Sequence, residues 1–373
     1  MQDRSSEPLP TQLHPLPSQP AGRAWPTLTW ATGPQLTGDP DRLDDVLSRA
    51  FRVNPNSELA LSLAFVAVQG GRIVAERYGP GTTASSTCIS WSTAKSITQV
   101  ALGLALKDGL IDLDAPAPVP QWSDPEDPRH AITIRNLLAM RSGLEFNEDY
   151  VDAGSSHCLE MLFGEGAQDM AAYAAGQPLI APIDSEFNYA SGTTVILSRI
   201  LTDALGGQES CARYLQERLF DPLGMSTAEP KYDPAGTFVG SSYVYATARD
   251  FARFGLFALR GGIWQDEALL PPGWIDDGRR PLSYDPSNDH YYGEHWWSPG
   301  DRFGTFQARG YEGQVIAAVP ALDLVVVRLG KSPIEHAPAL RTFFEDVLEC
   351  FVEDTSESEP ASSGRELVEV KNT

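Results

Sequence analysis

The sequence predicts an α+β fold: one antiparallel sheet built from both ends of the chain, flanked by helices, with a helical lobe beside it. Two observations predict this fold. Runs of β-branched residues gather near the two ends of the 373-residue chain, whereas the middle has the spacing of amphipathic helices. Strands from both ends bury their apolar faces most simply in one sheet, and a cleft between sheet and lobe is a natural site.

The strands are expected in two stretches. Residues 61–79 (LSLAFVAVQGGRIVAERYG) contain two β-branched runs around a Gly-Gly pair, which is typical of a hairpin turn. Residues 304–330 (GTFQARGYEGQVIAAVPALDLVVVRLG) predict about three strands. The sheet part is therefore expected at about residues 25–90 and 290–352.

Helices are expected through the middle of the chain and at its end. The pattern over residues 96–107 places Val100 and Leu104 on one face, and Gly109 ends it. Similar patterns cover residues 133–140, 193–205, 210–220, 247–260 and 340–352. The helical lobe is expected at about residues 105–285, within one folded domain of residues 25–352.

The two ends of the chain differ from this domain in composition. Residues 1–24 are polar and Pro-rich, which predicts a flexible arm, and residues 353–373 predict a disordered tail. The arm has no apolar run typical of a secretory signal, and no stretch approaches the roughly 18 apolar residues of a membrane helix. The sequence therefore favours a cytoplasmic protein without a membrane partner.

Charge and cysteine content exclude other classes. The net charge of −22 argues against a nucleic-acid partner, because phosphate binding needs clusters of Lys and Arg. The same field weakly favours cationic over anionic substrates. The four cysteines form no CxxC pair, so free thiols are expected rather than a disulfide framework or a zinc site.

Ser92-Thr93-Ala94-Lys95 is the only Ser-x-x-Lys in the chain. A serine hydroxyl needs a base to become a nucleophile, and residues three apart on a helix share a face. If Ser92 begins a helix, its backbone N–H is free to polarise a carbonyl. Taken alone, the motif is equally consistent with a surface lysine in the first turn of a helix.

Further segments follow this motif in a definite order: ITIRNLLAMRSGL at 132–144, FNYASG at 187–192 and FDPLGM at 220–225. Together they resemble the serine β-lactamase and penicillin-binding-protein superfamily. Among its class C-like serine hydrolases, the chain is most similar to the 6-aminohexanoate-dimer hydrolase (nylon-oligomer hydrolase) group. The resemblance covers nearly all of residues 25–350 and implies a β-lactamase/transpeptidase-like fold.

The resemblance implies a role for each motif residue. Ser92 would be the nucleophile, and Lys95 and Tyr189 would move its proton to the leaving group. An ammonium at Lys95 favours the phenolate of Tyr189. The backbone N–H groups of Ser92 and Tyr311 would form the oxyanion hole, and Ser191 would bind substrate. A packed aromatic at a helix start is the alternative interpretation of Tyr189.

Two motifs depart from the family pattern. The third motif of the superfamily, Lys-Thr-Gly or His-x-Gly on a strand, matches Ala308-Arg309-Gly310, so Ala308 replaces the usual cation. In the second motif, which matches Tyr189-Ala190-Ser191, Ser191 replaces the usual asparagine, and both changes count against penicillin recognition. Gly310 fits a strand that substrate approaches closely. Arg309 is a candidate partner for a substrate carboxylate, although strand alternation can turn it away from Ser92.

Two aromatic residues also resemble the nylon-oligomer group. Tyr150 follows the RSG turn, and Trp297 belongs to a YGxxWW segment. The resemblance implies that both line the substrate pocket. A role in the hydrophobic core is equally consistent with either residue.

The sequence therefore predicts a serine hydrolase that cleaves a small linear amide or a carboxylic ester through an acyl-enzyme on Ser92. No metal or other cofactor is expected, and the predicted partner is a small-molecule substrate. One alternative is a β-lactamase or D,D-peptidase acting on penicillin-like substrates. Another is a non-catalytic binding module on the same scaffold. The sequence leaves the oligomeric state open.

Overall fold

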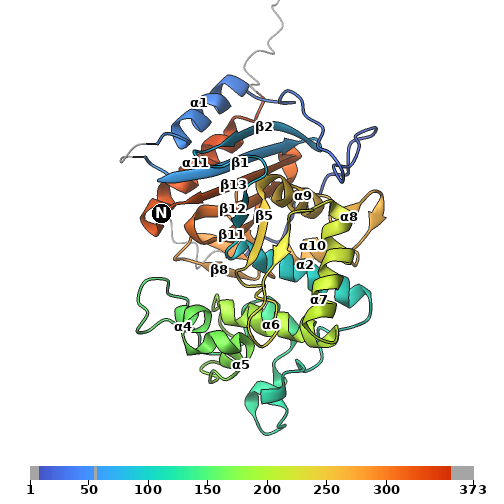
Figure 1. Ribbon diagram of the computed structural model, residues 1–373, viewed down its shortest axis with the longest axis vertical. Coiled ribbons are helices and arrows are strands. Elements are labelled where there is room, and N and C mark those ends of the chain that lie inside the picture. Colours follow the sequence, from blue (N-terminus) through green and yellow to red (C-terminus); the bar gives the residue numbers. More distant parts are fainter. Residues whose placement is uncertain (1–7, 54–56, 354–373) are drawn as a thin grey trace, which may run out of the picture.

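Strands from both ends of the chain pair in one eight-stranded antiparallel sheet (Figure 1). The computed structural model describes residues 8–53 and 57–353, so almost all of the predicted tail lies outside the described residues. The strand order is β2 (Arg72–Tyr78), β1 (Leu61–Gln69), β13 (Leu324–Lys331), β12 (Gln314–Val319), β11 (Phe306–Gly310), β10 (Trp297–Ser298), β9 (His290–Tyr292) and β8 (Ser283–Asp285). Because β1 pairs directly with β13, the predicted joining of the two chain ends is confirmed.

The predicted turn and strands of this sheet are present. Gly70 and Gly71 connect β1 and β2 with φ of 56° and 72°, which residues with a β-carbon rarely adopt. The three strands predicted in residues 304–330 are β11, β12 and β13. The sheet also includes β8, which begins at Ser283, a few residues before the predicted start of the C-terminal sheet part.

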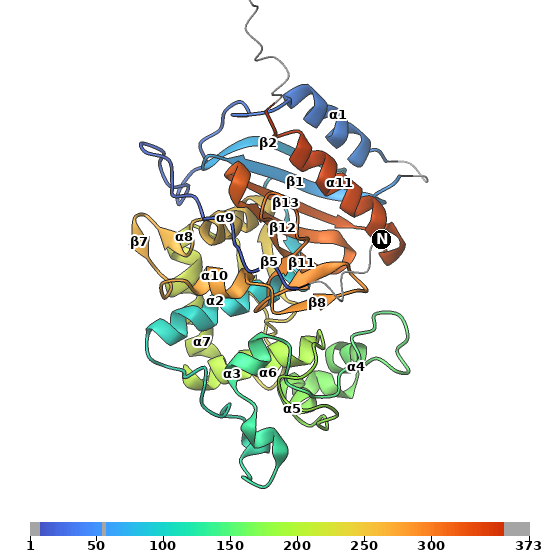
Figure 2. The same ribbon diagram turned by 180° about the vertical axis from the view of Figure 1, so that it is seen from behind.

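Helices cover both faces of the sheet (Figures 1 and 2). On one face, α1 (Pro40–Ala50) and α11 (Ala337–Glu349) pack over a cluster that includes Phe65 and Val326. On the other face, α2 (Thr93–Lys107) and α9 (Ala248–Leu259) pack over a cluster that includes Val325. Burial on both faces explains why β13 begins with a continuous apolar run, residues 324–327, rather than an alternating pattern.

The middle of the chain forms the helical lobe. Its helices are α3 (Ile134–Leu138), α4 (His157–Phe163), α5 (Met170–Ala175), α6 (Ser191–Ala204), α7 (Gln208–Leu215) and α8 (Asp221–Leu223), and α10 (Trp274–Arg279) follows α9. The expected helices at 133–140, 193–205 and 247–260 correspond to α3, α6 and α9 within two residues at each end. None of the helices in the described ranges is long and apolar enough to span a bilayer.

Short strands that the sequence pattern does not reveal complete the fold. β3 (Thr87–Ile89), β5 (Val244–Thr247) and β4 (Glu229–Pro230) form a small sheet, and β6 (Ile263–Trp264) pairs with β7 (Glu267–Ala268). Strands of two to four residues are too short for a hydrophobic period. β3 of the small sheet ends at Ile89, three residues before Ser92, and therefore sets the position of that residue.

Residues 8–24, the described part of the predicted flexible arm, lie along the domain. The Gln19 side chain accepts a hydrogen bond from Arg260 (3.0 Å), and the carbonyl oxygen of His14 accepts one from Arg279 (2.5 Å). Both arginines are buried. A buried guanidinium needs acceptors, and the arm supplies some of them.

His295 ties the sheet part to the helical lobe. Its Nδ1 lies 2.9 Å from the carbonyl oxygen of Leu138, and its Nε2 lies 2.9 Å from Thr194 Oγ1. Its own carbonyl oxygen accepts a hydrogen bond from Ser96 at 2.6 Å. Burial lowers the pKa of His295 to about 3, so the ring is neutral, donates to Leu138 and accepts from Thr194. This one residue therefore joins α2, α3 and α6 beneath the cleft.

Candidate active site

Ser92 lies at the N-terminus of α2, directly after the segment that connects the small sheet to this helix. The Ser90 N–H donates to the Val244 carbonyl oxygen at 2.9 Å, and the Ser90 hydroxyl donates to the Ser242 carbonyl oxygen at 3.0 Å. Trp91 then takes a left-handed φ of 45°, which is rare for a bulky residue. Ser92 follows as the N-cap residue of α2, and at this end of a helix the backbone N–H groups have no partner within the helix.

The ammonium group of Lys95 lies beside the Ser92 hydroxyl. Lys95 is only 2% exposed, and its Nζ is 2.9 Å from Ser92 Oγ. It also donates to Ser191 Oγ at 2.9 Å and to the Ser241 carbonyl oxygen at 3.1 Å. A lysine ammonium has three donors, and these three oxygens satisfy all of them. The spacing predicted from Ser-x-x-Lys thus brings the two side chains together.

Tyr189 closes the cluster from the helical lobe. Lys95 Nζ lies 4.9 Å from the centre of its ring. Burial raises the pKa of Tyr189, whereas the charge of Lys95 and the contacts with Ser92 and Lys95 lower it, and the net shift is upward. Lys95 thus favours the phenolate as expected, but burial outweighs it. At neutral pH, Tyr189 is a neutral phenol that can donate a proton.

β11 lies against the Ser92 turn because residue 310 has no side chain. A β-carbon on Gly310 would lie 2.5 Å from the carbonyl oxygen of Ser90 and 3.1 Å from the backbone nitrogen of Ser92. Tyr311 follows directly, and its ring packs edge-on to Trp91 at 5.8 Å. The backbone groups at Ser92 and Tyr311 are therefore neighbours, as an oxyanion hole requires.

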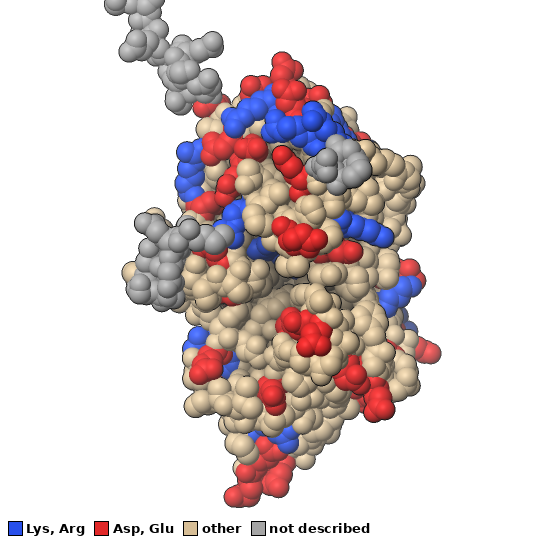
Figure 3. Space-filling model, turned by 90° about the vertical axis from the view of Figure 1, so that its left-hand side faces the viewer, with Lys and Arg blue, Asp and Glu red and all other residues tan. Residues whose placement is uncertain are grey.

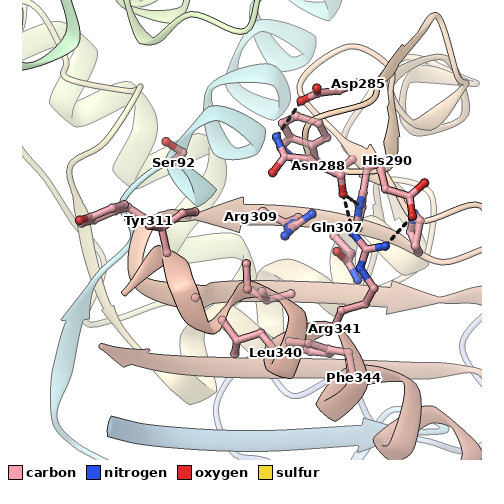
Figure 4. Close-up of a pocket in the computed structure, with 18 of the residues that line it drawn as sticks. Ser92, Asp285, Asn288, His290, Gln307, Arg309, Tyr311, Leu340, Arg341 and Phe344 are labelled. Carbon is pink, nitrogen blue, oxygen red and sulfur yellow. Dashed lines mark hydrogen bonds and ion pairs between the residues drawn. The ribbon is translucent and has the colours of Figure 1, made fainter. Parts of the chain in front are cut away.

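These groups open into a cavity of about 500 Å³ (Figure 4). Figure 4 shows Ser92 and Tyr311 at one end and Arg341 of α11 at the other, and Tyr189 also lines the cavity. In the space-filling view, the molecule is hollowed between the sheet part and the lobe, with acidic side chains above and below (Figure 3). The volume suits a ligand of small-molecule size.

Comparison with known proteins identifies this arrangement. Residues 47–345 match the Beta-lactamase family. The chain belongs to the β-lactamase family. It is a serine hydrolase, and its sheet, flanking helices and lobe are those of the β-lactamase/transpeptidase-like fold.

Relatives within and around this family are distant in sequence. The chain is 25% identical over 315 residues to the 6-aminohexanoate-dimer hydrolase of Paenarthrobacter ureafaciens, covering 78% of each protein. The structure of a proposed 6-aminohexanoate-dimer hydrolase from Bacillus anthracis superposes with a TM-score of 0.69, at 22% identity over 87% of each chain. A penicillin-binding protein homologue from Caulobacter crescentus superposes at 0.59 and 17% identity, over 81% of this chain and 96% of that one. Both structures share the fold.

The third motif of this β-lactamase family member has no cation at its first position. Ala308 is 1% exposed and packs into the apolar core beneath α2. Arg309, one residue later, lies on the opposite side of the strand and lines the cavity. The anticipated turning of Arg309 away from Ser92 therefore does not take it out of the cavity, because the cavity continues past β11.

The two pocket aromatics of the sequence analysis both line the cavity. The Tyr150 ring lies 5.0 Å from that of Tyr311, and its hydroxyl donates to Glu148 at 2.9 Å. Trp297 is 6% exposed, and its ring lies 5.1 Å from that of Tyr189. Both residues are largely buried and also line the cavity. Each therefore has the pocket position that the resemblance implies and also packs in the protein interior.

Glu148 is a further site residue that the sequence analysis did not identify. One carboxylate oxygen accepts the Ser191 N–H at 2.7 Å, and the other accepts the Ser191 hydroxyl at 2.5 Å. The Ser191 hydroxyl in turn accepts from Lys95. Glu148 therefore sets the direction of the Ser191 hydroxyl and, through it, one of the three hydrogen bonds of Lys95. The signal in the sequence that could have identified Glu148 was its position in the segment FNEDY, two residues before Tyr150.

The variant Glu148→Gln tests this positioning role. The amide of glutamine presents a donor where the carboxylate accepts, so the Ser191 hydroxyl must turn and Lys95 loses a fixed acceptor. Loss of one charge-assisted hydrogen bond, about 1.5–3 kcal/mol, corresponds to a tenfold to hundredfold lower kcat. Steady-state kinetics should show this fall with KM changed much less, together with a displaced pH–rate profile. Glu145→Gln is the matched control, and an equal loss in both variants contradicts the role.

Gly310→Ala tests the contact between β11 and the Ser92 turn. The added methyl group cannot be placed without moving the backbone at Ser90 or Ser92. Such a shift displaces the two N–H groups proposed to hold the oxyanion, and loss of one such donor costs roughly a hundredfold or more in kcat. Gly154→Ala, at an exposed loop glycine that does not line the cavity, is a control for substitution of glycine. An unaltered kcat in Gly310→Ala would show that the close contact is not needed.

Proposed function

We propose that the protein hydrolyses a small linear amide, of the 6-aminohexanoate-oligomer kind, or a carboxylic ester, through an acyl-enzyme on Ser92. The observation that carries the proposal is the hydroxyl of Ser92 held 2.9 Å from the buried ammonium of Lys95 at the end of a cavity. A buried lysine beside a serine hydroxyl is suited to move its proton.

The steps follow from the positions of these groups. In the reactive form Lys95 is the free amine, and as Ser92 Oγ bonds to the substrate carbonyl carbon its proton passes to Lys95 Nζ. The carbonyl oxygen becomes an oxyanion held by the N–H groups of Ser92 and Tyr311. When the carbonyl re-forms, the C–N or C–O bond breaks, Tyr189 gives its phenol proton to the leaving nitrogen or oxygen, and the proton held by Lys95 passes to the Tyr189 oxygen. Water then attacks the acyl-enzyme by the same route, its proton restoring the Ser92 hydroxyl.

The choice of substrate class rests on two supports. The curated relative at 25% identity is named as a 6-aminohexanoate-dimer hydrolase. In addition, the methyl group of Ala308 is buried in the core, so this chain has no cation where the first residue of the third motif stands. Both favour a linear substrate over a penicillin.

The test combines turnover with covalent trapping. The purified protein is assayed with a chromogenic ester, a chromogenic cephalosporin and the linear 6-aminohexanoate dimer, and it is treated with a serine-directed phosphonate. Turnover of ester or linear dimer is expected, with one phosphonate on the peptide that contains Ser92. Absence of both turnover and label would exclude the enzyme proposal in favour of a binding module. Fast cephalosporin turnover would replace it with a β-lactamase.

A further inference from the structure

The cavity that begins at Ser92 continues past β11 to α11. Its far end is walled by apolar side chains of β12 and α11, which are Val315, Leu340, Phe344 and Leu348. The turn between β8 and β9, residues 285–290, lines the opposite side (Figure 4). An apolar wall of this kind accepts a methylene chain better than a polar group. The described chemistry at Ser92 and Lys95 does not use this end of the cavity.

Arg309 stands within this far part of the cavity without a hydrogen-bonded anion. Its Nη1 is buried and has no hydrogen-bond partner among the described residues. Its guanidinium carbon lies 6.0 Å over the ring of Trp297, which holds it in place by a cation–π contact. In Figure 4, hydrogen bonds and ion pairs join the neighbouring side chains, whereas none is drawn to Arg309.

The two carboxylates beside Arg309 accept hydrogen bonds from other described residues, and Asp285 acts on Arg309 through its charge alone. Asp289 forms an ion pair with Arg341 at 2.5 Å. Asp285 accepts a hydrogen bond from the Asn288 side chain at 2.7 Å. Burial and the charge of Arg309 lower the pKa of His290 to about 3, so this ring is neutral.

The other acids that line the cavity have donors of their own or face solvent. Glu148 accepts from Ser191, Asp301 accepts two backbone N–H groups, and Glu312 accepts from the Trp91 side chain at 3.3 Å. Glu345 is exposed. The unmet requirement of the cavity is therefore for an anion at Arg309.

A buried cation without a hydrogen-bonded anion is unfavourable, and a ligand anion removes that cost. Burial lowers the pKa of Arg309 to about 10, so the group is still charged at neutral pH. Its planar fork of donors matches the two oxygens of a carboxylate.

The position of Arg309 relative to Tyr189 indicates which end of a substrate it meets. Tyr189 and Arg309 both contact Trp297: the Tyr189 and Trp297 ring centres are 5.1 Å apart, and the Arg309 guanidinium carbon lies 6.0 Å from the centre of the Trp297 ring. Tyr189 is the group proposed to protonate the leaving group. Arg309 therefore lies near Tyr189, with which it interacts electrostatically, and this proximity favours the leaving-group side of the scissile bond for its ligand.

We infer that the far end of this cavity binds a carboxylate at the end of an apolar chain on the leaving group, with Arg309 as its partner. The inference rests on the proposed hydrolysis at Ser92 and adds the substrate class: amides or esters whose leaving group is an ω-amino or ω-hydroxy carboxylate. The overall charge of −22 disfavours anionic substrates at long range, but salt screens that field, whereas a buried pair is screened little.

A matched pair of substrates tests the inference. The 6-aminohexanoate dimer and its terminal carboxamide differ only in the charge of the leaving group. The ratio of their kcat/KM values is measured for the full chain, for Arg309→Gln and for Arg302→Gln. Arg302 is an exposed arginine paired with Glu349 outside the cavity, so its substitution controls for loss of one positive charge. Dimers with a glycine leaving group test the need for the apolar chain.

The protein is expected to prefer carboxylate over carboxamide by about tenfold to a hundredfold, the effect of one charge-assisted pair. Arg309→Gln should bring this ratio close to one, Arg302→Gln should keep it, and the glycine leaving group should be cleaved more slowly. Equal kcat/KM for carboxylate and carboxamide in the unaltered protein, or an undiminished ratio in Arg309→Gln, overturns the inference.

A binding measurement separates this inference from the proposed hydrolysis. Calorimetry with Ser92→Ala measures the affinity for the intact dimer and for its carboxamide without turnover, and tighter binding of the dimer is expected. If both bind equally while the unaltered protein cleaves the carboxamide through Ser92, the carboxylate site is wrong and the hydrolase proposal stands. If neither compound is cleaved but the dimer binds more tightly, the carboxylate site stands and the linear-amide proposal is wrong.

Discussion

Replacement of Ser92 by alanine is expected to lower kcat/KM by a factor on the order of 10⁴ or more, because the nucleophile is removed and only binding and oxyanion stabilisation remain. The neighbouring hydrogen-bond network keeps two of its three acceptors, since Lys95 still donates to Ser191 and Ser241. The variant should therefore fold normally, and thermal denaturation should show a midpoint close to that of the unaltered protein.

The measurement is kcat/KM on the substrate that the unaltered protein cleaves fastest, with the phosphonate label as a second readout. Ser85→Ala, an exposed serine of the loop before β3, is the matched control and should keep both. Retention of labelling or of substantial turnover in Ser92→Ala would show that another group attacks the carbonyl.

Replacement of Lys95 by methionine is expected to give the second largest loss, about 10³–10⁴-fold in kcat, in the range of a lost general acid–base group. Methionine keeps most of the volume of the lysine side chain but donates no hydrogen bond. Ser92 Oγ then loses its proton acceptor, and the upward shift in the pKa of Tyr189 becomes larger because the opposing charge is gone. The remaining activity should therefore need a higher pH.

Steady-state kinetics and a pH–rate profile measure this effect. Lys107→Met, at the far end of the same helix, is the matched control for loss of a lysine from α2. Because Lys95 is buried among polar acceptors, Lys95→Met also leaves the Ser241 carbonyl without its lysine donor, and the thermal midpoint should fall. A full loss of kcat at an unaltered pH optimum, with the phosphonate still attached at the normal rate, would argue that Lys95 has only a structural role.

Local spacing was enough to predict most of the elements that hold the site. The Ser-x-x-Lys pair shares a face of α2 because three residues make nearly one helical turn, and that geometry needs no tertiary contact. The continuous apolar run at the start of β13, residues 324–327, and the Gly70-Gly71 turn are likewise determined by adjacent residues. α1 was not predicted, although Asp39 caps it and Pro40 begins it, both local signals of a helix start.

The sequence by itself determined the sheet from both chain ends, the helical middle and the resemblance that led to Ser92, Lys95 and Tyr189. Only the tertiary structure decided that burial raises the pKa of Tyr189 against the charge of Lys95. It also decided that Glu148 reaches Ser191, 43 residues along the chain, and that the buried Nη1 of Arg309 has no hydrogen-bond partner among the described residues. The reason is physical. Helix and strand periods depend on neighbouring residues, whereas desolvation and hydrogen-bond partners depend on which distant segments exclude water together.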